Sequence, residues 1–258
     1  MDTRSVAEIR ALFKATPFEE LDSFVAEFSC DPRAGVQTLV RAAQHKCQAE
    51  RDERERIQRM MALQLRLHEA GYMVIAGVDE VGRGALAGPV SAAAAVLDAG
   101  VHIPGLDDSK RLTPAAREIV AERVRKAAIA LSVAHVTSDR VDALGIARAN
   151  TLAMCMALQE LPHAVDHVIA DGLEVDLCMP STFVVGGDRL CACVAAASVV
   201  AKVERDSLMR EFDSTYPGYD FAINKGYGTV EHIEAIDRLG PSPVHRLSFA
   251  PCSQHRLF

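Results

Sequence analysis

The sequence predicts an α/β fold, in which a mixed sheet is flanked by helices and preceded by an all-helical extension. Three observations lead to this prediction. Residues 1–70 carry apolar side chains at helical spacing and contain no strand-like run. From residue 73 onward, short apolar runs alternate with longer amphipathic segments. Acidic residues and glycines collect where the apolar runs end, which is where open α/β sheets place their binding sites.

Composition sets the class of protein. The chain has 258 residues, of which 49% are hydrophobic and 24% charged, as in a globular protein with one sizeable domain and a small appendage. No apolar run is long enough to span a membrane and no secretory signal is visible, so we expect a cytoplasmic protein without a membrane partner. The seven cysteines are odd in number and lack a C-x-x-C pair, which favours reduced thiols over a disulfide framework or a zinc site.

The net charge of −7 argues against a protein that binds nucleic acid through a basic surface alone. Nearly all of the acidic excess lies in residues 71–258. An acidic site that holds divalent cations would account for part of it, because bound metal ions reverse the local field. Net charge therefore leaves a nucleic-acid partner open.

The N-terminal region, residues 1–70, is expected to form a helical extension of a main domain over residues 71–258. Pro17 and the pair Asp31-Pro32 separate its apolar stripes into successive helices. Between residues 44 and 59 the sequence becomes very polar, with charges of both signs at close spacing, as on a solvated helix with local ion pairs. The role of this extension stays open between stabilisation and contact with a substrate or partner.

The main domain is expected to alternate strands and helices. Each strand is assigned to a short apolar run bounded by turn residues, and each helix to a longer amphipathic segment. Thr113-Pro114 is a typical helix start, with Thr as the N-cap and Pro in the first turn. The expected strands cover residues 73–78, 90–97, 130–136, 167–170 and 182–185, and the other expected helices cover residues 150–161, 190–212 and 229–239.

The stretch IAGVDEVGRGALAGPV, residues 75–90, is the first candidate site. Asp79 and Glu80 follow an apolar run directly, and Arg83 stands between glycines. Adjacent strand residues point to opposite faces, so both carboxylates serve one site only if the strand ends or bulges there. An exposed strand end with an ordinary Gly-rich turn is the alternative. Two acids beside an apolar strand are unusual for a plain turn, which favours a functional site.

Two further acids follow predicted strands. Asp171 precedes Gly172, and Asp188 follows two glycines, so each alone would be an ordinary turn residue. Together, four carboxylates from three strand ends suit a hard cation, Mg²⁺ or Mn²⁺. Two such ions can activate a water and stabilise the leaving oxygen in phosphodiester hydrolysis. Histidines and thiols are absent from these positions, which disfavours zinc.

From Met73 to about Pro251 the chain resembles the bacterial ribonuclease HII family, within the type 2 ribonucleases H. The N-terminal helices resemble the extension found in some bacterial members. The motifs that carry the resemblance are GVDEVGRG at 77–84, LDDSKRLT at 106–113, GIARANTLAM at 145–154, IADG at 169–172, GGDRLCACVAAASVVAKVERD at 186–206, YPGYDFAINKGYGT at 216–229 and HRLSFAPC at 245–252.

The resemblance implies a ribonuclease H-like fold and a metal-dependent endonuclease. Such an enzyme cuts the RNA strand of RNA–DNA hybrids and cuts duplex DNA 5′ of single embedded ribonucleotides, leaving 3′-hydroxyl and 5′-phosphate ends. Its cofactor would be a divalent metal, Mn²⁺ or Mg²⁺. The residues that match the catalytic and metal-binding acids of the family are Asp79, Glu80, Asp171 and Asp188.

The resemblance also implies a set of substrate-binding residues. A glycine–arginine–glycine loop would read the 2′-hydroxyl, and a tyrosine would pack on the sugar that follows the ribonucleotide. Two lysines would contact phosphates or steady the acidic site, and a third, Lys225, stays open between that role and solvated surface. A serine four residues before Lys202, and so on the same face of its helix, would also contact a phosphate. An ion pair at the surface, a core tyrosine and solvated lysines are the alternatives. These residues are Gly82, Arg83, Gly84, Tyr227, Lys110, Lys202 and Ser198.

The last five residues, Gln254 to Phe258, resemble the Q-x-x-L-F peptide with which bacterial proteins bind the sliding clamp. A frayed tail is the alternative. Nothing in the sequence marks an apolar partner surface, so we expect a monomer.

Two other functions stay open on the sequence alone. One is a module that binds nucleic acid without cutting it, against which stand the four acids and the lack of a basic stripe. The other is a DNA nuclease or resolvase of the same fold. The sequence leaves the preferred metal, and the preference between isolated ribonucleotides and long hybrids, undecided.

Overall fold

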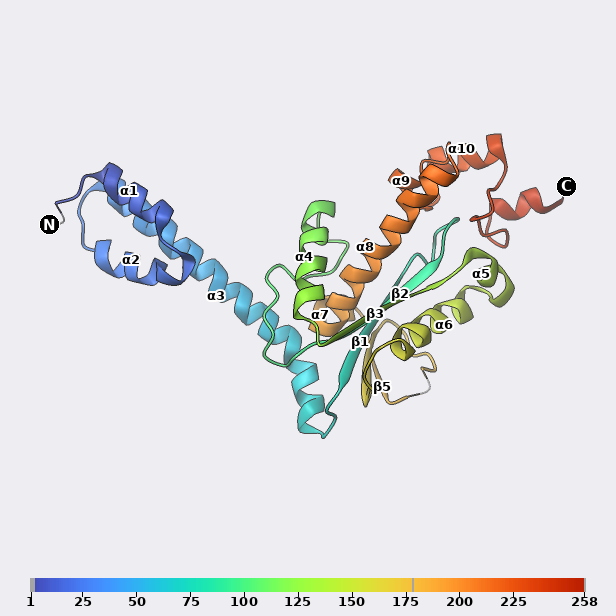
Figure 1. Cartoon of the computed structure of the whole chain (residues 1–258), viewed down its shortest axis with the longest axis horizontal. Helices are drawn as coiled ribbons and strands as arrows, with labels where there is room; N and C mark the ends of the chain where they lie inside the picture. The colour runs from blue at the N-terminus through green and yellow to red at the C-terminus, as the bar shows by residue number, and fades with distance from the viewer. Residues whose placement is uncertain (1–2, 178, 258) are drawn as a thin grey trace. The chain divides into compact units, whose positions relative to one another are not determined.

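The structure is a computed structural model that describes residues 3–177 and 179–257. It divides into two compact units, Met1–Gln58 and Arg59–Phe258. Figure 1 shows the first unit in blue and the second in the remaining colours. Among the described residues, no helix is long and apolar enough to cross a membrane.

The first unit is helical, as the sequence predicts. It contains α1 (Val6–Ala15), the short helix η1 (Phe18–Glu20), α2 (Leu21–Phe28) and the first part of α3 (Ala34–Glu69). Ser5 begins α1 with a capping box, in which its side chain and that of Glu8 each accept a backbone N–H. The core of the first unit consists of Ile9, Leu21, Phe24, Phe28, Val36, Leu39, Val40, Ala43 and Cys47.

The second unit is built on a mixed sheet of five strands, which confirms the predicted fold class. In the order β3–β2–β1–β4–β5, the pairs β3–β2 and β2–β1 are antiparallel, whereas β1–β4 and β4–β5 are parallel. The strands are β1 (Ile75–Val81), β2 (Val90–Val96), β3 (Ala130–Val136), β4 (His167–Asp171) and β5 (Ser181–Val184).

Helices cover both faces of this sheet. Ala76 and Val78 of β1 belong to a core cluster with residues of α6 (Ile146–Gln159). Gly77, between them, faces α8 (Ala192–Thr215), because a Cβ built there would lie 2.2 Å from the carbonyl carbon of Cys193. Glycine at this position therefore lets the start of α8 lie directly on β1. Figure 1 shows both helices beside the strands.

Shorter helices complete the second unit. Thr113 is the N-cap of the first, as predicted, and its side chain accepts the N–H of Ala116. Four of them, α5, α7, α9 and η2, are too short to show a helical period in the sequence and were not predicted. They are α4 (Pro114–Ala127), α5 (Ser138–Leu144), α7 (Gly187–Leu190), α9 (Phe221–Asn224), α10 (Val230–Leu239) and η2 (Cys252–Leu257).

Three expectations about local structure were wrong. The strand expected at residues 73–78 runs from Ile75 to Val81, because Asp79 and Glu80 pair with Ala93 and Ala92 of β2 and so continue the ladder. The helix expected from residue 150 already begins at Ile146. Asp188 is not at a strand end: the left-handed Gly186, with φ +75°, turns the chain so that Asp188 lies in α7.

Candidate active site

Four acids from three elements meet where strands β1 and β4, in the middle of the sheet, come to an end. Strand β1 carries Asp79 and Glu80, and Asp171 ends the neighbouring parallel strand β4, where Val78 and Ala170 are partners. The N–H of Gly187 donates to Asp171 Oδ1 at 2.7 Å, which ties α7 and its Asp188 to the end of β4. The structure therefore brings together the four acids that the sequence singled out.

Burial raises the pKa of three of these acids, Asp79, Glu80 and Asp188. Asp79 is fully buried, and burial, with the charges of Glu80 and Asp171, holds its pKa well above the usual value. Burial raises the pKa of Glu80, although Arg83 opposes this. Burial also raises the pKa of Asp188, as do the carboxylates of Asp108 and Asp171. Such a cluster costs free energy unless positive charge is supplied.

The donor chemistry of this cluster fits divalent metal ions. All four side chains offer carboxylate oxygens, which Mg²⁺ and Mn²⁺ prefer, and a cation would relieve their repulsion. Within the part of the chain that the structure describes, no group of three or more His, Cys, Asp and Glu side chains is already arranged as a metal-binding set.

Ser198 of α8 lies beneath Asp79. Its side chain is 4% exposed and forms a hydrogen bond with the Asp79 carboxyl, which opposes the rise in the pKa of Asp79. The Ser198 and Ser109 hydroxyl oxygens are 3.0 Å apart. Ser198 therefore fixes the orientation of a candidate metal ligand, and a phosphate contact of its own stays a prediction.

The loop before α4 adds charged residues to the site. Lys110 Nζ lies 3.4 Å from Asp188 Oδ2, and although burial opposes it, the charges of Asp188 and Asp108 raise the pKa of Lys110. Sequence reasoning selected Lys110 but missed Asp108 and Ser109. Asp108 is buried and accepts the N–H of Lys110. The doubled acid in LDDSK was the available signal.

The glycine–arginine–glycine loop begins where β1 ends. Gly82 has a φ of +88°, a conformation that favours glycine. Arg83 and Gly84 are exposed to solvent. Arg83 Nη1 lies 3.1 Å from Glu80 Oε1, so the surface ion pair considered for Arg83 is present. Because its partner is one of the four acids, this ion pair belongs to the site.

A second loop, residues 225–228, lies against the first. The carbonyl oxygen of Gly226 accepts the N–H groups of Leu86 and Ala87. Tyr227 is half-buried, and Lys202 Nζ lies 5.8 Å from its ring centroid. Lys202 also donates to Asp206 at 2.7 Å. Since Ser198 and Lys202 are one turn apart on α8, this helix links the acids to the tyrosine loop.

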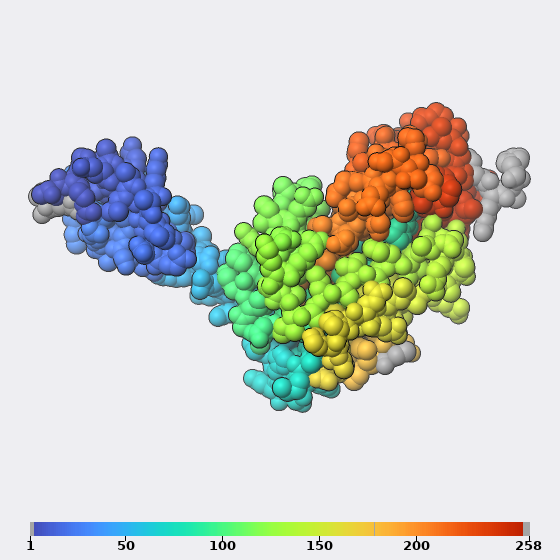
Figure 2. Space-filling model, viewed as in Figure 1, coloured from blue at the N-terminus to red at the C-terminus, as the bar shows by residue number. Residues whose placement is uncertain are grey.

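A recess beside this loop is lined by residues of α4, α8 and α9. It has a volume of about 350 Å³, and Arg117, Arg210 and Lys225 give it cationic walls, with Glu118 and Asp206 as counter-charges. Figure 2 shows the green residues of α4 and the orange residues of α8 on this face of the molecule.

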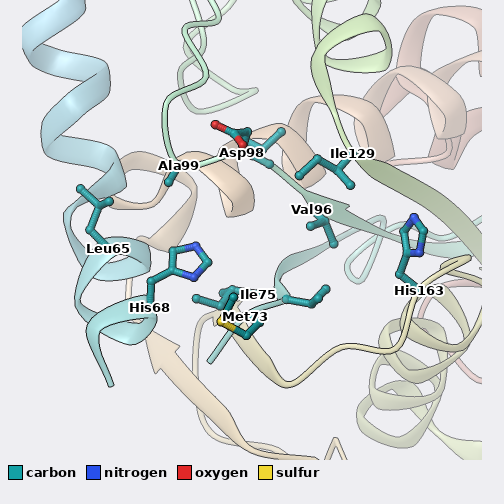
Figure 3. Close-up of a pocket in the computed structure, with 11 residues that line it drawn as sticks. Leu65, His68, Met73, Ile75, Val96, Asp98, Ala99, Ile129 and His163 are labelled. Carbon is teal, nitrogen blue, oxygen red and sulfur yellow. The ribbon is translucent and has the colours of Figure 1, made fainter. Parts of the chain in front are cut away.

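An apolar cavity of about 610 Å³ lies elsewhere. Figure 3 shows Ile75, at the start of β1, and Val96, at the end of β2, in its wall together with His68 and His163. Ala76 pairs with Val96, so this cavity is at the opposite end of β1 from the acids. It is not part of the candidate active site.

Comparison with known proteins identifies the family of the chain. The family model described as Ribonuclease HII matches residues 76–252, and the model described as Ribonuclease HII N-terminal domain matches residues 5–67. The ribonuclease HII of Desulfitobacterium hafniense is 42% identical over 251 residues, which are 97% of this chain and 95% of that protein. The ribonuclease HII of Listeria monocytogenes is 41% identical over 238 residues, 92% of this chain and 91% of that protein.

Solved structures show the same fold. The crystal structure of ribonuclease H2 from Pyrococcus horikoshii matches with a TM-score of 0.62 and 25% sequence identity. The match covers 71% of this chain and 97% of that chain.

Proposed function

The chain belongs to the ribonuclease HII family, whose members are endonucleases for the RNA strand of RNA–DNA hybrids, and from this premise we propose a finer activity. The protein cuts duplex DNA on the 5′ side of a single embedded ribonucleotide and leaves 3′-hydroxyl and 5′-phosphate ends. The observation that carries the proposal is the meeting of four carboxylates with an exposed glycine–arginine–glycine loop at the end of one strand.

The four acids Asp79, Glu80, Asp171 and Asp188 are proposed to hold two divalent ions, Mg²⁺ or Mn²⁺. When bound, such ions supply an activated water and stabilise the leaving oxygen. The raised pKa of Asp79 supports this assignment, because its cause, burial among like charges, is what a cation would offset.

The surrounding side chains orient the acids and bind phosphate. Ser198 holds the carboxyl of Asp79, and Lys110 lies beside Asp188. A scissile phosphate at the acids would draw Lys110, whose side chain is mostly exposed, away from Asp188. Lys202, on the same face of α8 as Ser198, is placed for a neighbouring phosphate.

Selection of the ribonucleotide rests on the two loops. Backbone groups of Gly82, Arg83 and Gly84 are proposed to bind the 2′-hydroxyl, the one group that separates RNA from DNA at a given nucleotide. Tyr227 is proposed to pack on the sugar that follows. An all-DNA duplex lacks the hydroxyl and is not cut.

Analysis of the product ends tests this mechanism. A hybrid whose RNA strand is labelled is expected to yield fragments with 5′-phosphate and 3′-hydroxyl ends in Mg²⁺ or Mn²⁺ and to stay intact in EDTA. Asp188→Asn is expected to lose cleavage and to bind Mn²⁺ more weakly in calorimetry, whereas the exposed Asp98→Asn serves as a matched control. Ends with a 2′,3′-cyclic phosphate would contradict the proposal, because they require attack by the 2′-hydroxyl instead of water.

We propose a sliding clamp as a protein partner, bound through residues 254–258, and a monomer as the free state. Phe258 lies outside the described residues, and Gln254 is exposed. Removal of residues 254–258 is expected to abolish clamp pull-down and to leave cleavage of short duplexes unchanged. Clamp binding that survives the deletion, or none by the full chain, would contradict the assignment.

A further inference from the structure

Two buried arginines lie directly behind the glycine–arginine–glycine loop. Arg205 of α8 and Arg246, which follows α10 in the chain, are both 0% exposed. Within the described part of the chain, neither guanidinium forms an ion pair with a carboxylate, and every hydrogen bond that either donates ends on a main-chain carbonyl oxygen. Two buried charges without a counter-ion are costly, so they indicate a specific role.

Arg246 binds the loop itself. Its guanidinium donates to the carbonyl oxygens of Gly82 at 2.7 Å, Arg83 at 2.9 Å and Gly88 at 2.9 and 3.1 Å. The planar fork of arginine can hold several oxygens in fixed directions at once, whereas a lysine ammonium is a point charge on a flexible stem.

These bonds decide where the N–H groups of the loop point. In a trans peptide the C=O and the N–H point in opposite directions. With the carbonyls of Gly82 and Arg83 turned inward to Arg246, the N–H groups of Arg83 and Gly84 are turned outward. Both residues are exposed, and in the described structure neither N–H donates to another protein group.

Arg205 joins this loop to the tyrosine loop. It donates to the carbonyl oxygens of Pro89 and Lys225, both at 2.9 Å, and of Ala87 at 3.1 Å. Its guanidinium carbon lies 5.5 Å from the ring centroid of Tyr227. A Cβ on Gly82 would lie 2.2 Å from Arg205 Nε, so the glycine is needed for this close approach.

We propose that Arg246, supported by Arg205, is a positioning residue that aims the N–H groups of Arg83 and Gly84 at the 2′-oxygen of the ribonucleotide. The inference rests on the proposed function, because it assigns the structural cause of 2′-hydroxyl reading. Arg246 touches no substrate and acts only through the peptide groups that it holds.

Binding in EDTA, where no cleavage occurs, tests the proposal. The readout is the ratio of Kd for an all-DNA duplex to Kd for the same duplex with one ribonucleotide. The full-length protein is expected to prefer the ribonucleotide roughly two- to tenfold, the size of one hydrogen bond. In Arg246→Lys this ratio is expected to fall to about one, while Kd for the all-DNA duplex changes little.

Met154→Ala is the matched control for lost stability. Met154 is a buried residue of α6 that packs in the core cluster with residues of the sheet. The control variant is expected to keep the preference at a temperature where thermal melts show both variants folded. Arg246→Gln provides a second variant with the same expected result. Retention of the wild-type ratio in either variant of Arg246 would overturn the proposal, as would failure of both to fold.

The crystal structure of free Arg246→Lys separates this proposal from the proposed function. It is expected to show the peptides 82–83 and 83–84 rotated, and peptides left in place would overturn the positioning role. A wild-type protein that neither prefers nor cuts the ribonucleotide would instead refute the proposed function.

Discussion

At the scale of residues, the proposed site has a cost in stability. Asp79 is buried beside Glu80 and Asp171, and its raised pKa means that the charged carboxylate destabilises the fold at neutral pH. The same charge is what would bind a metal ion. Active sites commonly contain such unfavourable groups, and the remainder of the fold offsets them.

Asp79→Asn should therefore raise the thermal unfolding midpoint of the metal-free protein while it removes cleavage. Each 1 kcal/mol gained corresponds to about 2–4 °C in a protein of this size. The loss of cleavage should exceed about 100-fold, the upper end of what loss of an outer-shell metal partner costs. Asp98→Asn is the control for both measurements. A midpoint lowered by Asp79→Asn, or activity retained, would contradict this account of the site.

Tyr227 allows a second test at this scale. Packing on a sugar requires the ring and not the hydroxyl, so Tyr227→Phe is expected to cut a single-ribonucleotide duplex at nearly the wild-type rate. Tyr227→Ala is expected to be slower by roughly tenfold, the size of a lost stacking contact. Single-turnover rates at saturating enzyme give the comparison. Equal rates for Tyr227→Ala and wild type would show that the ring does not contact substrate.

The residues that sequence reasoning found are those whose chemistry is visible locally. Asp79, Glu80, Asp171 and Asp188 are acids beside glycines or apolar runs, and their position after three predicted strands suggested a metal site. Arg205 and Arg246 gave no such signal, because their partners are carbonyl groups, and all of these except that of Lys225 are more than 100 residues away along the chain. Main-chain partners leave no mark in the sequence.

At the scale of elements, the strands predicted most accurately from the sequence are those with apolar or small side chains. The runs 130–136 and 90–97 were found within one residue, because β2 is apolar or small throughout and β3 is so except at His135. The predicted end of β1 was too early. Charged residues seldom continue a buried strand, but here the pairing with β2 continues past Asp79 and Glu80. Helix α5 has less than two turns and helix α9 about one turn. Such short helices show no periodic spacing of apolar residues in the sequence.

Substitution of Gly77 tests how closely β1 and α8 pack. A methyl group at this position would meet the main chain of α8, which cannot move independently of its 24 residues. Gly77→Ala is expected to lower the free energy of unfolding by about 1–3 kcal/mol, as overpacking does, and to slow cleavage by moving α8 and Ser198 away from Asp79. Urea denaturation and cleavage rates measure both. Unchanged values would mean that the sheet and α8 adapt freely.

The contact between His232 of α10 and His245 of the C-terminal segment is expected to depend on pH. His232 Nε2 lies 3.0 Å from His245 Nε2, while His232 Nδ1 donates to the carbonyl of Tyr227 and His245 Nδ1 accepts the N–H of Ser242. Both rings are therefore neutral. Burial, and then His232, lower the pKa of His245 to about 4, and burial lowers the pKa of His232.

Proton binding by the two histidines determines how the stability of the fold changes with pH. The unfolded chain binds protons at these histidines near pH 6.5, and the folded chain only at lower pH, so stability is present above pH 6.5 and is lost as the pH falls toward 4. His245→Gln is expected to be less stable than wild type at pH 7.5 but to lose less stability on going to pH 5. Urea denaturation at the two pH values measures this. An equal loss in both proteins would contradict the assignment.

At the scale of the whole molecule, the boundary between the two parts of the chain is testable. Sequence pattern placed it after residue 70, whereas the structure divides after Gln58, within α3. Met60 and Met61 are buried, and Gln64 donates to the carbonyl of Leu97 at 2.8 Å. The sequence did not show that these contacts belong to the second unit, because α3 runs unbroken from Ala34 to Glu69.

A chain of residues 59–258 is expected to unfold cooperatively and to retain metal-dependent cleavage. A chain of residues 71–258 loses both methionines and should be less stable by about 3 kcal/mol or more. Urea denaturation of the two chains decides between the boundaries. Equal stability would place the boundary at residue 70.

The central claim is that the four acids and the two loops act together to cut beside a ribonucleotide. The most direct measurement is cleavage of a labelled DNA duplex with one ribonucleotide, resolved to single nucleotides, beside an all-DNA duplex and an RNA–DNA hybrid, in Mg²⁺, Mn²⁺ and EDTA. We predict one cut on the 5′ side of the ribonucleotide in either metal, none in EDTA and none in the all-DNA duplex. Cleavage of the all-DNA duplex at the same rate, or no cut beside the ribonucleotide while the hybrid is degraded, would contradict the claim.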